Sequence, residues 1–135
     1  MKAEEIEILV KHRIDQAREA LNDAKYLVDG KRSSQSIVNR AYYAMFYAAL
    51  ALLQSISKTP SKHSGVISLF DTEFVMKGTF EKALSKDFHK AFEIRQKTDY
   101  KITKPTTRDK AIEMYYKAEN FVNKVQDYLI FQKPS

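Results

Sequence analysis

The sequence predicts an all-α protein, an up-and-down bundle of four long helices and one short helix. Three observations indicate this class. The 135 residues contain only three glycines and three prolines that could interrupt regular structure. Residues that favour helices dominate the long stretches between these positions. Apolar residues in these stretches recur at spacings of three and four, the period of a helix with a buried face. A chain of this length fits a single domain, 1–135.

The first two helices are predicted to form an antiparallel pair. The first is predicted from Ala3 to Asp29, with Gly30 as its end. The short linker after it implies an immediate return of the chain. Ser33 or Ser34 is expected to cap the second helix, which is predicted to end near position 57.

The second helix has almost no polar face between positions 36 and 53. A helix that is apolar all round must be surrounded by other elements, so we place it at the centre of the fold. Its few polar groups must then be hydrogen-bonded inside the bundle or belong to a site. These groups are on Asn39, Arg40, Tyr42, Tyr43 and Tyr47.

Three further helices complete the predicted bundle. The third and shortest runs from about Lys62 to Met76, with Gly78 as its stop. The fourth runs from about Thr79 to Tyr100, and a proline in the following loop, 101–105, disfavours helical geometry just before it. The last spans about 107–131.

The charge is modest and concentrated in one region. The net charge is +6, and the segment from Lys82 to Lys110 holds nine basic and four acidic residues, which is five of this excess. The absence of cysteine excludes disulfides, thiol chemistry and cysteine-ligated zinc. The acidic first residues differ from a secretory signal, so we expect a cytoplasmic protein.

Neither a metal nor a membrane is expected. The three histidines do not form a pair at metal-ligand spacing, so the sequence predicts no metal site and no cofactor. The apolar stretch 37–53 is short for a bilayer span and carries Asn39 and Arg40 near one end. We interpret it as a core helix.

Three patches together resemble a known family. They are Asn39–Ala49, His63–Val66 and Arg95–Tyr100, and their order and spacing resemble the small stand-alone prokaryotic HEPN domain (higher eukaryotes and prokaryotes nucleotide-binding). The resemblance implies a homodimeric helical bundle that binds RNA or nucleotides. It also implies pairing with a minimal nucleotidyltransferase in a toxin–antitoxin system.

The chain departs from the ribonucleases of this family. In those members, an arginine on the fourth helix is followed by a histidine, with four to six residues between them. The corresponding positions after Arg95 are Tyr100, Lys101 and Ile102. Tyrosine, with an ordinary pKa near 10, is a poor base at neutral pH. The sequence therefore favours a binding protein over an enzyme.

The candidate binding residues gather around Arg95. Arg95 and Asp99 lie one turn apart, either as a surface ion pair or with Asp99 holding a guanidinium that binds phosphate. Arg40 is either a buried structural residue, with Asp99 as a partner, or part of the site. The full set of candidates for RNA or nucleotide binding is Arg95, Asp99, Tyr100, Arg40, Tyr43, Lys97 and Lys101.

Two features remain open at this point. His63, at the predicted start of the third helix, is expected to cap or pack, although it could replace the missing histidine. Lysines at 82, 86 and 90 form a basic ridge, either a solvated face or a track for a phosphate backbone. Three functions follow: a binding module, a metal-independent endoribonuclease that uses Arg95 with Tyr100 or His63, and a structural adaptor without catalysis.

Overall fold

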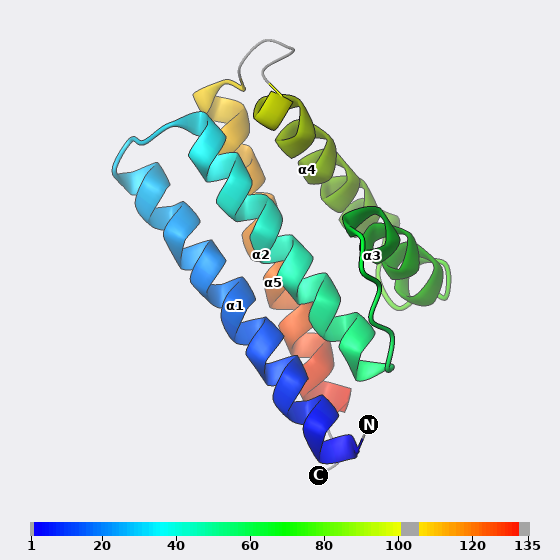
Figure 1. Cartoon of the computed structure of the whole chain (residues 1–135). Helices are drawn as coiled ribbons and strands as arrows, with labels where there is room; N and C mark the ends of the chain where they lie inside the picture. Colours follow the sequence, from blue (N-terminus) through cyan, green and yellow to red (C-terminus); the bar gives the residue numbers. More distant parts are fainter. Residues whose placement is uncertain (1, 101–105, 133–135) are drawn as a thin grey trace.

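The computed structural model describes residues 2–100 and 106–132, with side chains for 2–97 and 106–130. Every regular element within these ranges is helical, which confirms the predicted all-α class (Figure 1). The elements are α1 (Ala3–Asp29), α2 (Ser34–Ser55), α3 (His63–Phe70), η1 (Asp71–Val75), α4 (Lys82–Tyr100) and α5 (Arg108–Gln132).

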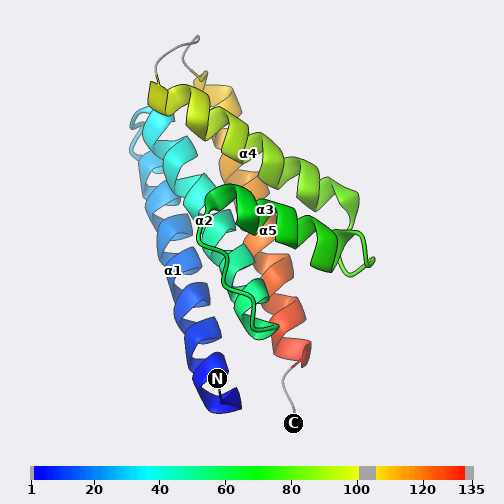
Figure 2. The same ribbon diagram turned by 45° about the vertical axis from the view of Figure 1, so that its right-hand side comes forward.

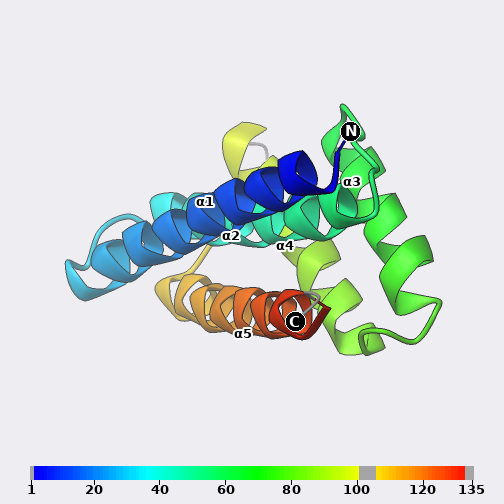
Figure 3. The same ribbon diagram turned by 90° about the horizontal axis from the view of Figure 1, so that it is seen from below.

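The helix α2 lies at the centre of the bundle, as its sequence predicts. It contacts α1, α3, α4 and α5, and thirteen of its 22 residues are buried. The helices α1 and α5 also contact each other, and Figures 1 and 3 show these three helices side by side. Figure 2 shows α3 and α4 lying across α2. An all-round apolar surface on α2 is therefore matched by neighbours on every side.

The ends of α2 follow from local backbone geometry. Ser33 is the N-cap, and its Oγ accepts from the Ser36 N–H at 3.2 Å. The helix ends at Ser55, two residues earlier than predicted. The backbone of Ser57 adopts a left-handed conformation with φ of 61°, which an α-helix cannot continue.

The third predicted helix consists of two parts, α3 and the wider π-helical turn η1. In this turn the Met76 N–H donates to the Asp71 carbonyl oxygen at 2.8 Å, five residues back. The Asp71 carboxylate accepts from the Ser85 hydroxyl at 2.6 Å and lies 2.6 Å from Nε2 of His89. Because Ser85 and His89 are on α4, this carboxylate ties the turn to the next helix. Gly78, with φ of 82°, ends the segment as predicted.

An aromatic cluster joins α3, α4 and α5. Phe70, Phe88 and Phe121 are each fully buried. Their ring centroids lie 5.7 Å apart for Phe70 and Phe88, and 5.3 Å apart for Phe70 and Phe121. The Phe88 and Phe121 centroids are 5.2 Å apart. This contact fixes α3 and α4, which carry the candidate site, on the rest of the core.

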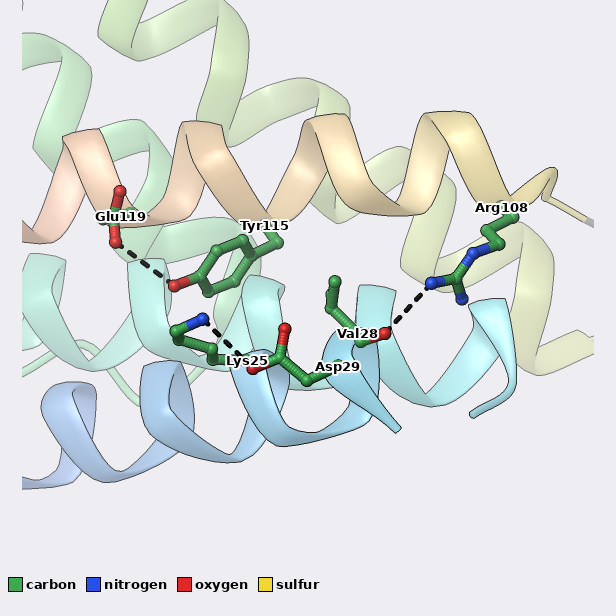
Figure 4. Close-up of polar contacts among 6 residues, drawn as sticks. All are labelled: Lys25, Val28, Asp29, Arg108, Tyr115 and Glu119. Carbon is green, nitrogen blue, oxygen red and sulfur yellow. Dashed lines mark hydrogen bonds and ion pairs between the residues drawn. The ribbon is translucent and has the colours of Figure 1, made fainter. Parts of the chain in front are cut away.

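The C-terminal end of α1 is held by α5 (Figure 4). Nη2 of Arg108 donates to the Val28 carbonyl oxygen at 3.0 Å, and the same carbonyl accepts from the Lys31 N–H at 3.1 Å in the turn that ends the helix. Two turns further along α5, the Tyr115 hydroxyl donates to the Glu119 carboxylate at 3.2 Å. Burial, and then the charge of Glu119, raise the pKa of Tyr115 to about 12.

The described helices include none with the length and hydropathy needed to cross a membrane.

Candidate functional site

Arg95 reaches from α4 onto two aromatic rings of α2. Its Cζ lies 5.5 Å from the ring centroid of Tyr42 and 5.3 Å from that of Tyr43. The side chain is partly exposed, but its Nε atom is buried. A guanidinium at these distances is attracted by the negative face of each ring. Arg95 therefore faces the bundle, at the junction of α2 and α4. Its helical spacing from the apolar stripe of Leu84, Phe88 and Ala91 in the sequence predicts this orientation.

A hydrogen bond connects the same tyrosine to the first residue of α3. Tyr42 is fully buried, and its hydroxyl lies 2.8 Å from Nδ1 of His63. The imidazole stacks on Phe46 with 4.2 Å between centroids. His63 is partly exposed, at the N-terminus of α3. It does pack, as expected, and it packs on the rings of Tyr42 and Tyr43, which Arg95 also contacts.

The electrostatics of this cluster favour neutral forms of Tyr42 and His63. Burial raises the pKa of the Tyr42 hydroxyl, and the Arg95 charge opposes only part of that rise. Burial, and then the positive charge of Arg95, lower the pKa of His63. At neutral pH the cluster thus contains one cation, a neutral phenol and a neutral imidazole.

Arg40 reaches the other tyrosine of the pair. Its Cζ lies 5.2 Å from the Tyr43 centroid, so the Tyr43 ring contacts two guanidinium groups. Nε and Nη2 of Arg40 donate to Oδ1 of Asn39 at 3.1 and 2.9 Å. Among the described residues, the hydrogen-bond partner of this partly exposed guanidinium is therefore a neutral amide. Tyr47 continues the same side of α2, 5.9 Å from Tyr43 between centroids.

Three of the predicted site residues cannot be placed with the others. Asp99 and Tyr100 lie in the last turn of α4, but their side chains are outside the described residues, and Lys101 is outside them altogether. The predicted pairing of Arg40 with Asp99 therefore stays a prediction. Lys97 is exposed and pairs with Glu93 at 2.8 Å, on the solvent side of α4 and not on the rings of Tyr42 and Tyr43.

The basic ridge on α4 lies on the surface. Lys82, Lys86 and Lys90 are all exposed. Lys90 lowers the pKa of Glu93 by its charge, after the larger effect of Lys97. The ridge therefore adds positive charge to the helix that carries Arg95.

The described residues around Arg95 offer hydrogen-bond donors and aromatic faces, and His63 is the one side chain described among them of a type that binds metals. The described residues contain no group of three or more histidine, cysteine or acidic side chains that could hold a metal ion. A guanidinium fixed on aromatic rings suits an anion with several oxygen atoms, such as phosphate. The arrangement is therefore chemically compatible with such an anion.

Sequence reasoning did not identify Tyr42 as a site residue. It left the Tyr42 hydroxyl either hydrogen-bonded inside the bundle or part of a site, and it did not find the partner of this hydroxyl. The signal was present, because a buried hydroxyl needs a hydrogen-bond partner and His63 is a polar residue at the start of a short, mostly apolar helix. The pairing spans 21 positions along the chain, so it depends on how α3 folds back onto α2.

Comparisons with known proteins agree on one family. The model of the HEPN domain matches residues 10–128. The chain is 38% identical over 126 residues to Putative toxin MJ0605 of Methanocaldococcus jannaschii. The aligned residues cover 93% of this chain and 90% of the relative. It is 40% identical over 110 residues to a UPF0332 protein of Thermotoga maritima, covering 82% of this chain and 83% of the relative.

Proposed function

Because the chain belongs to the HEPN domain family, we propose that it is an RNA- or nucleotide-binding module that takes phosphate at Arg95. The observation that carries the proposal is the guanidinium of Arg95 over the rings of Tyr42 and Tyr43, at 5.5 and 5.3 Å. Aromatic faces orient a guanidinium without neutralising its charge. Its planar donors match two oxygen atoms of one phosphate.

The surface of α4 supports a nucleic-acid ligand. The exposed lysines 82, 86 and 90 precede Arg95 on the same helix, and the segment from Lys82 to Lys110 carries most of the net charge. Lysines that neutralise phosphates release bound counterions, which makes such binding sensitive to salt. A single strand could place one phosphate at Arg95 and others along this ridge.

The cellular role that we propose is that of a toxin. One relative is named a putative toxin, and the family resemblance implies a nucleotidyltransferase partner. We propose that the chain acts as a cytoplasmic homodimer held by such a partner. Light scattering would test the dimer, and co-purification with the product of an adjacent nucleotidyltransferase gene would test the partner.

The test of phosphate binding compares Arg95→Ala with a charge-matched control. Fluorescence anisotropy would measure the affinity for a labelled single-stranded RNA at two salt concentrations. Lys11→Ala is the control, because Lys11 is an exposed cation on α1 that pairs with Asp15 at 2.9 Å. We expect Arg95→Ala to weaken binding and to reduce the salt slope by about one, and Lys11→Ala to change neither.

Equal binding by wild type and Arg95→Ala would contradict this proposal. It would leave the third function, an adaptor in which Arg40 and Arg95 serve only the packing of the bundle. In that case Arg40→Met and Arg95→Met should alter the melting temperature and no interaction.

A second function, a metal-independent endoribonuclease, is favoured by the position of His63. An imidazole is the group that exchanges protons near neutral pH, and the fold of α3 brings this one beside the charge of Arg95. The raised pKa of Tyr42 makes that hydroxyl unsuitable as a base. The test is RNA cleavage in the presence of a chelator. Cleavage that is lost in Arg95→Ala would establish the enzyme.

A further inference from the structure

We propose that His63 is a second phosphate ligand, a neutral imidazole that donates its Nε2–H beside the guanidinium of Arg95. The tautomer is set by the hydrogen bond between Nδ1 and the Tyr42 hydroxyl. This proposal rests on the proposed function, because it concerns the phosphate that Arg95 would bind. It adds a specific donor and a specific protonation state to the site.

The tautomer follows from the burial of Tyr42. Its side chain is fully buried, so its O–H must find an acceptor inside the protein. Among the described residues, the acceptor within reach is Nδ1 of His63, at 2.8 Å. A nitrogen that accepts this bond carries a lone pair, and a neutral imidazole then carries its proton on the other nitrogen. His63 is therefore a donor through Nε2.

The two proposed phosphate donors rest on the same aromatic support. The His63 ring stacks on Phe46 and Tyr42, with 4.2 and 5.8 Å between centroids, and meets the edge of Tyr43 at 5.8 Å. Arg95 lies over Tyr42 and Tyr43. The imidazole comes from the start of α3 and the guanidinium from α4, so two elements approach one place from different directions.

This arrangement fits an anion that only accepts hydrogen bonds. Phosphate oxygens point in several directions, so one phosphate can accept from both donors at once. A cationic ligand would meet the charge of Arg95. Because burial and Arg95 both lower the pKa of His63, the imidazole stays neutral at pH 7, and the bond from Tyr42 stays intact.

The same tautomer opposes a role for His63 as a general base. To accept a proton at Nε2, the ring would first have to move its own proton to Nδ1. The buried Tyr42 hydroxyl would then lose its acceptor among the described residues, at a cost of roughly 1–3 kcal/mol. This tautomer therefore favours binding, and a ribonuclease of this fold could use His63 only as an acid, through its Nε2–H.

The first test observes the imidazole directly. Long-range proton–nitrogen NMR spectra distinguish a nitrogen that carries a proton from one that carries a lone pair. We expect His63 to show the Nε2–H tautomer at pH 7.5, and Nε2 to shift when inorganic phosphate, 5′-AMP or a short single-stranded RNA is added. The three ligands distinguish a free phosphate, a nucleotide and a nucleic-acid backbone as the source of the bound group. A predominant Nδ1–H tautomer would overturn the proposal.

The second test separates a donor from a base by substitution. His63→Gln keeps a neutral N–H donor near the place of Nε2 but has no titrating nitrogen, whereas His63→Leu has neither. Of the three ligands, the one that wild type binds most tightly is used here. We expect the affinity of His63→Gln for this ligand to lie within about threefold of the wild-type affinity. We expect His63→Leu to bind about tenfold or more weakly, the loss typical of a hydrogen bond to a charged group.

A double variant protects the test against unfolding. His63→Leu leaves the Tyr42 hydroxyl without its partner, so Tyr42→Phe is added to remove both polar groups. If this folded double variant binds as well as wild type while Arg95→Ala does not bind, His63 is not a ligand, although the proposed function stands. If wild type binds none of the three ligands, the proposed function itself fails.

Discussion

The hydroxyl of Tyr42 offers a measurable link between the core and the site. Tyr42→Phe removes this hydroxyl and keeps the ring, which is fully buried and contacts His63, Phe46 and Arg95. The change deletes the 2.8 Å hydrogen bond to Nδ1 of His63. His63 is partly exposed, so water can replace some of the lost bond. We expect a loss of about 1 kcal/mol in the free energy of unfolding.

Chemical denaturation at pH 7.5 would measure this loss. For a domain of this size, a loss of about 1 kcal/mol corresponds to a melting temperature lower by roughly 3–6 °C. Tyr26→Phe is the matched control, because the Tyr26 side chain is 80% exposed. We expect this control to change stability by less than about 0.5 kcal/mol.

A double-mutant cycle assigns the loss to one bond. Combining Tyr42→Phe with His63→Leu should cost less than the sum of the two single changes, because either one already removes the bond. Additive effects, or a Tyr42→Phe variant as stable as Tyr26→Phe, would refute the hydrogen bond and with it the tautomer inferred for His63.

Two further predictions follow from the same structure. Arg95→Met should raise the pKa of His63 in an NMR titration, but not fully to its ordinary value, because burial is the larger cause of its lowering and Arg95 the second. A lowered pKa in the folded state makes wild type most stable above about pH 6.5 and less stable as pH falls through the folded-state pKa, so this acid-side loss should be smaller in Arg95→Met. Gly78→Ala should lower the free energy of unfolding by about 1 kcal/mol in urea titrations, since the φ of 82° is unfavourable for alanine although no atom lies within 4 Å of the added Cβ.

The fold was predictable because each element carries its own signal. The all-round apolar surface of α2 identified the central helix, and Gly30, Gly78 and the serine cap identified boundaries within one or two residues. The division of the third helix into α3 and η1 was not predictable. It is accompanied by the contacts of Asp71 with Ser85 and His89, which exist only after the chain has folded back.

The site was predictable only in part. The apolar stripe on α4 placed Arg95 toward the interior of the bundle. Spacings of three and seven residues placed Arg40, Tyr43 and Tyr47 on one side of α2. Helical periodicity within one segment says nothing about which side chain of another segment lies opposite. For this reason the partners of Tyr42 were missed.

The position of each polar group determines which experiments can separate function from folding. Tyr42 is fully buried on the central helix, so any change there alters stability and the site together. Arg95 and His63 are partly exposed and reach the site from α4 and α3. The cluster of Phe70, Phe88 and Phe121 fixes these two helices independently of either side chain. Substitutions at Arg95 and His63 should therefore alter phosphate binding in a protein that keeps its fold.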